Sequence, residues 1–110
     1  MYLIVHITAS SREEAEKIGR ALVEERLVAC ANLIPGVTSL YTWEGKTCES
    51  SEVMIEAKTV ASCFDALTRR VKDLHSYDVP EIVAFPLERG SREYLDWVSK
   101  STLPEGPKTN

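Results

Sequence analysis

The side chains best suited to chemistry lie in one short stretch, "HSYDVPEIV", which begins at His75. His75, Tyr77, Asp78 and Glu81 surround Pro80 there. An imidazole with nearby carboxylates can bind a metal, act in acid/base catalysis, or shape a turn. The chain has no H-x-x-x-H pair that would place two ligands on one helix face. On these residues alone, all three uses stay open.

The turn has structural uses of its own. His75 follows an apolar helical pattern, and a histidine at a helix C-terminus can bond the last carbonyls. Asp78 can hydrogen-bond within its own turn. Pro80 favours an extended conformation at Val79 and so directs the start of the next strand. Glu81 opens that strand beside His75 and is the best carboxylate candidate for a functional role.

The chain has three cysteines and no C-x-x-C pair, which argues against a disulfide framework and favours a reducing cytoplasm. Cys30 lies between two alanines, as a buried small residue would. Cys48 follows a predicted turn, and Cys63 lies at the start of a predicted helix. Cys48 has no neighbouring base, and the helix dipole would activate Cys63 only mildly, so none of the three is expected to act as a nucleophile.

Several classes of function are disfavoured by the sequence. It contains no G-x-S-x-G, P-loop, G-x-G-x-x-G or H-E-x-x-H motif, so we expect no enzyme activity and no organic cofactor. A net charge of -4 with scattered basic residues argues against nucleic acid as a partner. No apolar run approaches the roughly 20 residues of a membrane span, and no signal peptide is expected.

Hydrophobic periodicity gives the elements that must position these residues. It predicts strand, helix, strand, strand, helix, strand and a last helix, at residues 2–8, 10–27, 29–43, 47–59, 61–75, 81–88 and 90–100. Serine and acidic residues predict the helix starts, at Ser10 or Ser11, at Ser62 with Asp65, and at Ser91. In the last helix, Tyr94, Trp97 and Val98 are predicted to face inward. The Pro35-Gly36 dipeptide predicts a bulge on an edge strand.

This order predicts a single α+β domain over residues 1–102, with a frayed tail at 103–110. It is the ferredoxin-like βαββαβ arrangement with an added C-terminal helix and a long hairpin between the second and third strands. Two helices cover one face of such a sheet. The first and last strands carry apolar residues on both faces, so the uncovered face should be buried by self-association.

Three phrases resemble the CutA family of divalent-cation tolerance proteins over residues 2 to 99: "ERLVACANLIPGVTSLYTWEGK", "EVMIEAKT" and "LHSYDVPEIVAF…YLDWV". The resemblance implies a ferredoxin-like fold assembled as a tight homotrimer, cytoplasmic in microbes. It also implies a role in tolerance to copper and other divalent metals, with copper binding in some members. No established catalytic activity comes with it.

The resemblance also implies metal ligands. They are His75, from the motif H-x-Y-x-x-P-E, and Cys30, with Glu81 as a further carboxylate. Some members have a cysteine near the end of the first strand, where this chain has Ile7, and a second histidine where it has Leu74. The expected metal is copper or another divalent cation.

A small-ligand pocket is a further hypothesis. Trp43, Lys58, Tyr77 and Glu81 are predicted to line a cleft between neighbouring subunits of the trimer. The alternative function is a signalling module similar to the trimeric PII proteins, which bind nucleotides in such clefts and act through protein partners. That alternative predicts basic residues in the cleft, for which the chain offers Lys58 and Lys72.

Overall fold

The computed structural model describes residues 1–104. Its elements are β1 (Tyr2–Ala9), α1 (Arg12–Glu24), β2 (Cys30–Trp43), β3 (Lys46–Val60), a 3₁₀ turn (Ala61–Cys63), α2 (Phe64–Leu74), β4 (Ile82–Pro86) and α3 (Arg92–Ser101). The predicted order of strands and helices is confirmed. Leu103, which the sequence assigned to a frayed tail, donates its backbone N–H to Arg26 and packs against the core. The rest of that predicted tail, from 105 on, lies outside the described residues.

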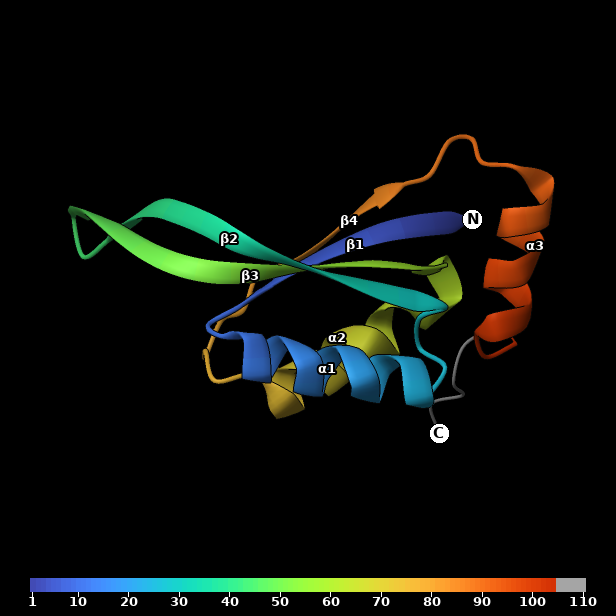
Figure 1. Cartoon of the computed structure of the whole chain (residues 1–110), viewed down its shortest axis with the longest axis horizontal. Helices are drawn as coiled ribbons and strands as arrows, with labels where there is room; N and C mark the ends of the chain where they lie inside the picture. Colours follow the sequence, from blue (N-terminus) through green and yellow to red (C-terminus); the bar gives the residue numbers. More distant parts are fainter. Residues whose placement is uncertain (105–110) are drawn as a thin grey trace.

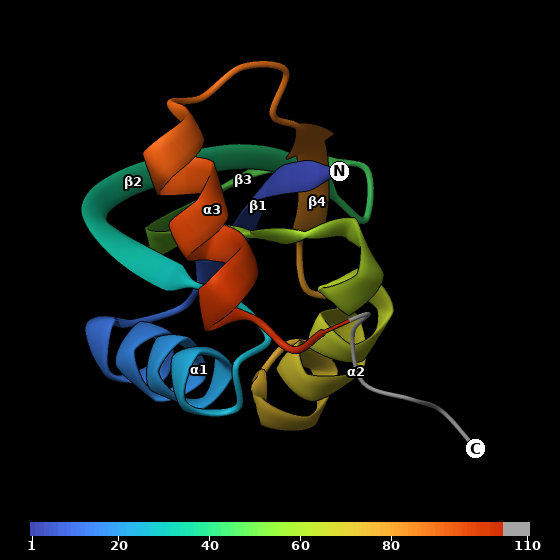
Figure 2. The same ribbon diagram turned by 90° about the vertical axis from the view of Figure 1, so that its right-hand side faces the viewer.

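The four strands form one antiparallel sheet in the order β2-β3-β1-β4. The first strand therefore lies inside the sheet, between strands that come later in the chain. α1 and α2 cover one face of the sheet, and α3 lies across one end of it (Figures 1 and 2). The opposite face carries no helix over most of its length (Figure 1).

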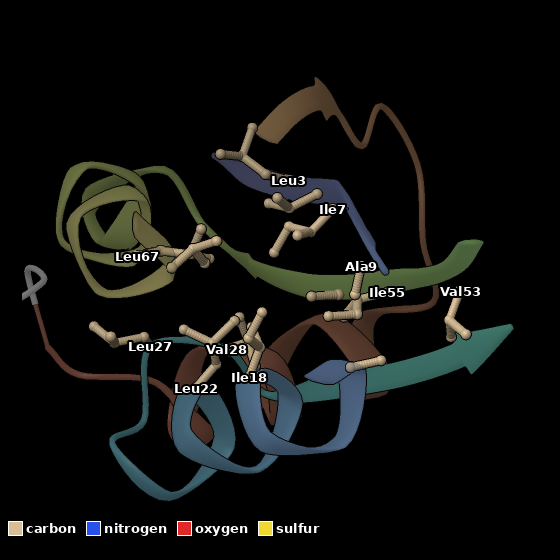
Figure 3. Packing of buried hydrophobic residues seen from close by; sticks show 14 residues of the cluster. Leu3, Ile7, Ala9, Ile18, Leu22, Leu27, Val28, Val53, Ile55 and Leu67 are labelled. Atoms are coloured by element: carbon tan, nitrogen blue, oxygen red, sulfur yellow. The ribbon is translucent and has the colours of Figure 1, made fainter. Parts of the chain in front are cut away.

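The core lies between the sheet and the two helices that cover it (Figure 3). Strand alternation sends every second residue of β1 and β3 toward this layer, because successive side chains point to opposite faces. α1 meets them with residues at helical spacing. The fully enclosed members include Val5, Ile7, Ile18, Leu22, Ile55, Leu67 and Val71. Each such side chain stabilises the fold by about 1.5–3 kcal/mol through burial.

Two of the three predicted helix starts are confirmed. Ser11 Oγ accepts the N–H of Glu14 at 3.1 Å, and Ser91 Oγ accepts the N–H of Tyr94 at 3.3 Å. The predicted cap by Ser62 and Asp65 is wrong. The chain passes from β3 through the 3₁₀ turn into α2, whose N-cap is Cys63 and has no side-chain capping bond.

β2 and β3 form a long hairpin that projects beyond the rest of the domain (Figure 1). Glu44 and Gly45 make its turn with φ of 51° and 76°, both in the left-handed region that two-residue hairpin turns need. The register shifts between Ile34 and Val37, at Pro35-Gly36, and β2 is an edge strand. The predicted bulge and its position are therefore confirmed.

We call the uncovered side of the sheet the open sheet face, and define it by Ile4, His6, Ile34, Glu56, Val83 and Phe85. Ile34, Val83 and Phe85 expose 43%, 44% and 44% of their surface. Such an apolar surface was expected from the sequence, and the single chain leaves it unburied. His6 Nε2 lies 3.1 Å from Glu56 Oε1 there and packs edge-on against the Phe85 ring.

One expectation for the last helix is corrected. Tyr94 and Trp97 were predicted to face inward with Val98, but they expose 40% and 44% of their surface. Val98 is the buried residue of α3. The helix lies across the end of the sheet and not on its face, so only a narrow stripe of it meets the core (Figure 2).

Candidate functional site

His75 fixes the loop that joins α2 to β4. Its backbone N–H donates to Val71 O at 2.9 Å and closes the last turn of the helix. Its ring Nε2 lies 2.7 Å from Thr8 O, and its Nδ1 lies 3.1 Å from the N–H of Tyr77. A carbonyl can only accept and an N–H can only donate, so the proton is on Nε2. The side chain has no exposed surface, and both ring nitrogens have partners.

Glu14, at the start of α1, holds the same loop from the other side. Its Oε2 accepts the N–H of Ser76 at 2.7 Å, and its Oε1 accepts the N–H and the hydroxyl of Ser10 at 2.9 Å each. Burial alone would raise the pKa of Glu14, but the hydrogen bonds from Ser10 and Ser76 outweigh it and lower the pKa from 4.5 to about 2. Glu14 is therefore a permanently charged hydrogen-bond acceptor that ties α1 to the loop.

A cavity of about 730 Å³ lies between this loop and the outer half of the β2–β3 hairpin. We call it the hairpin cavity. Its walls carry three carboxylates and three aromatic side chains, namely Glu52, Asp78, Glu81, Tyr41, Trp43 and Tyr77. No Lys, Arg or His is among the described residues that line it. The carboxylates therefore give it a negative potential, which attracts cations and repels anions.

The tyrosine hydroxyls of the cavity are held in place. Tyr77 donates to Glu52 Oε2 at 2.9 Å and so joins the loop to β3. The Tyr41 and Ser50 hydroxyls lie 2.7 Å apart on neighbouring strands. Burial, and after it the nearby Glu52 carboxylate, raises the pKa of Tyr77 to about 12. Tyr77 therefore keeps its proton at neutral pH and stays a donor.

The three predicted metal ligands are not brought together in the chain. Glu81 lines the hairpin cavity, and His75 is enclosed beside it. Cys30 lies elsewhere: its Sγ is 3.5 Å from the hydroxyl of Tyr94. In the sheet, Cys30 pairs with Lys58, which pairs in turn with Ile4 of β1, whereas the His75 ring bonds the carbonyl of Thr8. Ile4 and Thr8 are about 13 Å apart along β1.

The ligand chemistry expected from the family resemblance therefore does not fit a preformed site. Within residues 1–104, no group of three or more His, Cys, Asp or Glu side chains is close enough to hold a metal ion. For His75 to bind a metal, its ring would have to release Thr8 or Tyr77. Glu81 is the predicted ligand that needs no such rearrangement, because it is exposed at the cavity wall.

The four residues of the predicted cleft are divided. Trp43, Tyr77 and Glu81 line the hairpin cavity, but Lys58 does not. Lys58 Nζ donates to Asn32 Oδ1 at 2.8 Å and lies 3.9 Å from Glu56 Oε2, on the open side of the sheet. Trp43 pairs with Lys46 at the hairpin turn, about 40 Å along β3 from Lys58.

Some residues of the site were not found from the sequence. Strand alternation predicts that Glu52 and Tyr41 point to the same face of the hairpin, but it cannot show which loop packs against that face. Glu14 was recognised only as part of a helix cap, and its second role is to bond Ser76, which is 62 positions away. Only the tertiary fold brings these residues together.

Comparison with known sequences gives one family. The CutA1 divalent ion tolerance protein family matches residues 3–101. The "Divalent-cation tolerance protein CutA" of Thermus thermophilus is 52% identical over 99 residues, which cover 90% of this chain and 96% of that protein. The chloroplastic Protein CutA of Arabidopsis thaliana is 42% identical over 91% of this chain. The chain spans only 55% of the length of that plant protein.

Solved structures agree with the sequence comparison. A structure of the divalent cation tolerance protein Cut A1 from Thermus thermophilus has a TM-score of 0.92 and 51% identity, and the match covers 93% of this chain and 99% of that one. The structure described as the periplasmic divalent cation tolerance protein CutA from Archaeoglobus fulgidus has a TM-score of 0.89 and 42% identity. That match covers 92% of this chain and 98% of the other.

Proposed function

This chain belongs to the CutA1 divalent ion tolerance family, and from that premise we propose that it acts in divalent-cation tolerance as a non-enzymatic homotrimer that binds cations weakly. The observation that carries the proposal is the hairpin cavity, which has three carboxylates in its walls and no basic residue among those described. Glu81 is the member of the predicted ligand set that lines this cavity.

The geometry favours weak and exchangeable binding. Carboxylate and hydroxyl oxygens suit hard divalent cations and discriminate little among them. Of these carboxylates, Glu52 already accepts a hydrogen bond from Tyr77, and Asp78 and Glu81 are exposed. Copper or another divalent cation would therefore exchange readily with solvent, with Glu81 as a ligand and without His75 or Cys30.

The proposed assembly rests on the open sheet face. A monomer in solution would leave Ile34, Val83 and Phe85 in contact with water, at a cost that association removes. The exposed hairpin edge offers a strand for pairing between copies. The number three comes from the resemblance to the family, because an apolar face fixes no stoichiometry.

A cytoplasmic location is part of the proposal, following the three unpaired cysteines. Two relatives carry names that place them elsewhere, one chloroplastic and one periplasmic. In the described part of the chain, no helix combines the length and the apolar character that a bilayer crossing requires. Fractionation of cells that produce the full-length protein tests the location directly.

Calorimetric titration of the assembled protein with Cu(II) and Zn(II) tests the cation site. Wild-type protein should bind both ions, and Glu81→Gln should weaken binding about fivefold, as expected for the loss of one exposed charge interaction of about 1 kcal/mol. Glu88→Gln, an exposed acid outside the cavity, is the matched control. Absence of binding at millimolar metal, or equal binding by Glu81→Gln, would refute the proposed site.

The same titration with ATP addresses the signalling alternative. A nucleotide needs basic side chains or a glycine-rich phosphate loop, and the hairpin cavity offers neither among its described residues. Lys58, which the alternative required in the cleft, is bonded to Asn32. We therefore expect no ATP binding. Saturable ATP binding without metal binding would instead favour a nucleotide-sensing module.

A further inference from the structure

The aromatic side chains of the hairpin cavity have no role in binding a bare metal ion. Trp43, Tyr41 and Tyr77 expose 63%, 43% and 36% of their surface, and two apolar residues, Leu40 and Val79, also line the cavity. Metal ions take oxygen, nitrogen or sulfur ligands and gain little from an aromatic or aliphatic wall. The walls therefore combine negative charge with exposed aromatic surface. A bound metal ion would explain the negative charge but not the aromatic surface.

We propose that the hairpin cavity binds an organic cation, with its ammonium or guanidinium group against the aromatic rings and carboxylates. An organic cation is attracted by the face of Trp and Tyr rings and by carboxylates at once. Its carbon atoms can also bury the exposed apolar wall. The inference rests on the proposed role of this cavity as a cation-binding site, and it adds the class of ligand.

The size of the cavity agrees with this class. About 730 Å³ is the space of roughly two dozen water molecules at about 30 Å³ each. A divalent ion with one shell of six waters would fill only about a quarter of it. Pockets for small organic ligands fall within about 300–1,000 Å³.

The rings are also positioned before any ligand arrives. Tyr77 is fixed through its hydroxyl by Glu52 and through its backbone N–H by His75. The Tyr41 hydroxyl is bonded to Ser50 on the neighbouring strand. These bonds use the hydroxyl edges of the two rings. The Tyr77 ring also packs against the His75 ring, with the ring centroids 4.7 Å apart. A preformed wall of this kind lowers the entropic cost of binding.

The probe that separates charge from shape is tetramethylammonium, with tert-butanol as a neutral molecule of similar shape. Both are titrated into the assembled full-length protein carrying Trp97→Phe, so that Trp43, the other of the two tryptophans, reports alone by fluorescence. Saturable binding of tetramethylammonium, at least about tenfold tighter than that of tert-butanol, is expected. Equal binding of the two, or no saturable binding of either, overturns the proposal.

Calorimetry on variants tests the residues. Trp43→Ala and Glu81→Gln should each weaken tetramethylammonium binding by about threefold to fivefold, whereas Trp43→Phe should keep most of it. Trp97→Ala is the matched control, because Trp97 is also an exposed tryptophan and lies on α3, outside the cavity. Unchanged affinity in Trp43→Ala would overturn the proposal. An assembled protein in which a second copy of the chain fills the cavity would also overturn it.

The two proposals can fail separately. If Cu(II) and Zn(II) do not bind but tetramethylammonium does, the metal role of the cavity is lost and the organic-cation site remains. If the metals bind through Glu81 but tetramethylammonium does not, the proposed function stands and the present inference is refuted.

Discussion

Glu14 and His75 are two single residues that fix the loop in front of the hairpin cavity. Neither touches the cavity itself, but each holds a residue of the loop: Glu14 bonds Ser76, and His75 bonds Tyr77. Through Tyr77 they also determine where Glu52 meets the loop. Substitutions at these two positions should therefore act first on stability and loop order.

Glu14→Gln should lower the free energy of unfolding at pH 7 by about 2 kcal/mol, because the charged acceptor of Ser10 and Ser76 is lost. The pKa of Glu14 is about 2 in the folded protein and 4.5 without these bonds. Its contribution is thus fully present above pH 4.5 and disappears as pH falls toward 2.

Urea unfolding at fixed protomer concentration, at pH 7 and at pH 3, measures this change. The difference between wild type and Glu14→Gln should shrink at the lower pH. Glu13→Gln, in the same helical turn but exposed, should change little at either pH. An equal difference at both pH values would contradict the role given to the Glu14 charge.

His75→Ala should lower the free energy of unfolding by about 2–4 kcal/mol, because it leaves an empty space and an unpaired carbonyl at the buried Thr8. Since both ring nitrogens are used inside the protein, Cu(II) affinity should change less than twofold. Urea unfolding and calorimetry on the same sample measure the two quantities. Lost copper affinity with unchanged stability would instead make His75 a ligand.

At this scale the sequence singled out the stretch from His75 to Glu81, part of which lines the hairpin cavity, and left its chemistry open. Tyr77 and Glu81 lie at the cavity as a local motif can suggest, since Pro80 directs the turn. The partners of His75 could not be read from spacing, because Thr8 O is a backbone atom of a distant strand. The position of Lys58 within the chain could not be read from spacing for the same reason: its strand is long, and only the register shows that it lies far along β3 from the hairpin turn.

Among the elements, α3 receives its C-terminal cap from a residue outside it. Arg26 has a φ of 60°, in the left-handed region. Its guanidinium donates to the carbonyls of Lys100, Ser101 and Thr102 at 2.9, 3.4 and 3.2 Å. These carbonyls belong to the last turn of a helix, which has no intrahelical donors for them. Arg26 thus supplies the C-terminal cap of α3 from the loop after α1.

Arg26→Ala should loosen α3 and cost about 2 kcal/mol, since the cap is lost while the strained backbone remains. Arg26→Gly loses the same cap but suits a φ of 60°, so it should be more stable than Arg26→Ala by about 1 kcal/mol. Amide hydrogen exchange over Arg92–Ser101 and thermal unfolding measure both effects. Arg20→Ala, at an exposed position on α1, is the control. Equal stability of the Ala and Gly variants would show that the backbone at position 26 is not strained.

The elements themselves were largely predictable, because apolar periodicity in β1, α1 and β3 reports directly on which side meets the core. The failures occur where tertiary contacts override local preference. Ser62 is followed by an acid three positions on, but β3 continues to Val60 and the chain has no room for a separate cap. Tyr94 and Trp97 match a helical stripe, but α3 has only the end of the sheet to pack against (Figure 2).

For the whole molecule, the proposed assembly rests on the open sheet face. Phe85 and Val83 stand beside Ile4 and His6 on paired strands, so one substitution changes the centre of that surface. The hydrogen-bonded pair of His6 and Glu56 shows that the surface is not uniformly apolar. A partner copy would therefore have to match both a hydrophobic area and a hydrogen-bonded polar pair.

Phe85→Glu should shift the protein from trimer to monomer at micromolar concentration, because a charge replaces buried apolar area in every copy. Sedimentation equilibrium measures the mass. Val23→Glu, at a position on α1 that is 40% exposed, should leave the mass unchanged. A monomeric wild type would contradict the proposed assembly, and a trimeric Phe85→Glu would place the interface elsewhere.

The central position of β1 bears on how the chain folds during synthesis. Of the four strands, β1 leaves the ribosome before the others, but its two neighbours are completed only at Val60 and at Pro86. Until then its backbone groups have no sheet partners, while the β2–β3 hairpin can already close on itself. The backbone hydrogen bonds of β1 are thus completed only when β4 has been made. A nascent chain halted between β3 and β4 would expose the edge of β1 that later pairs with β4, and this edge could pair with other nascent chains.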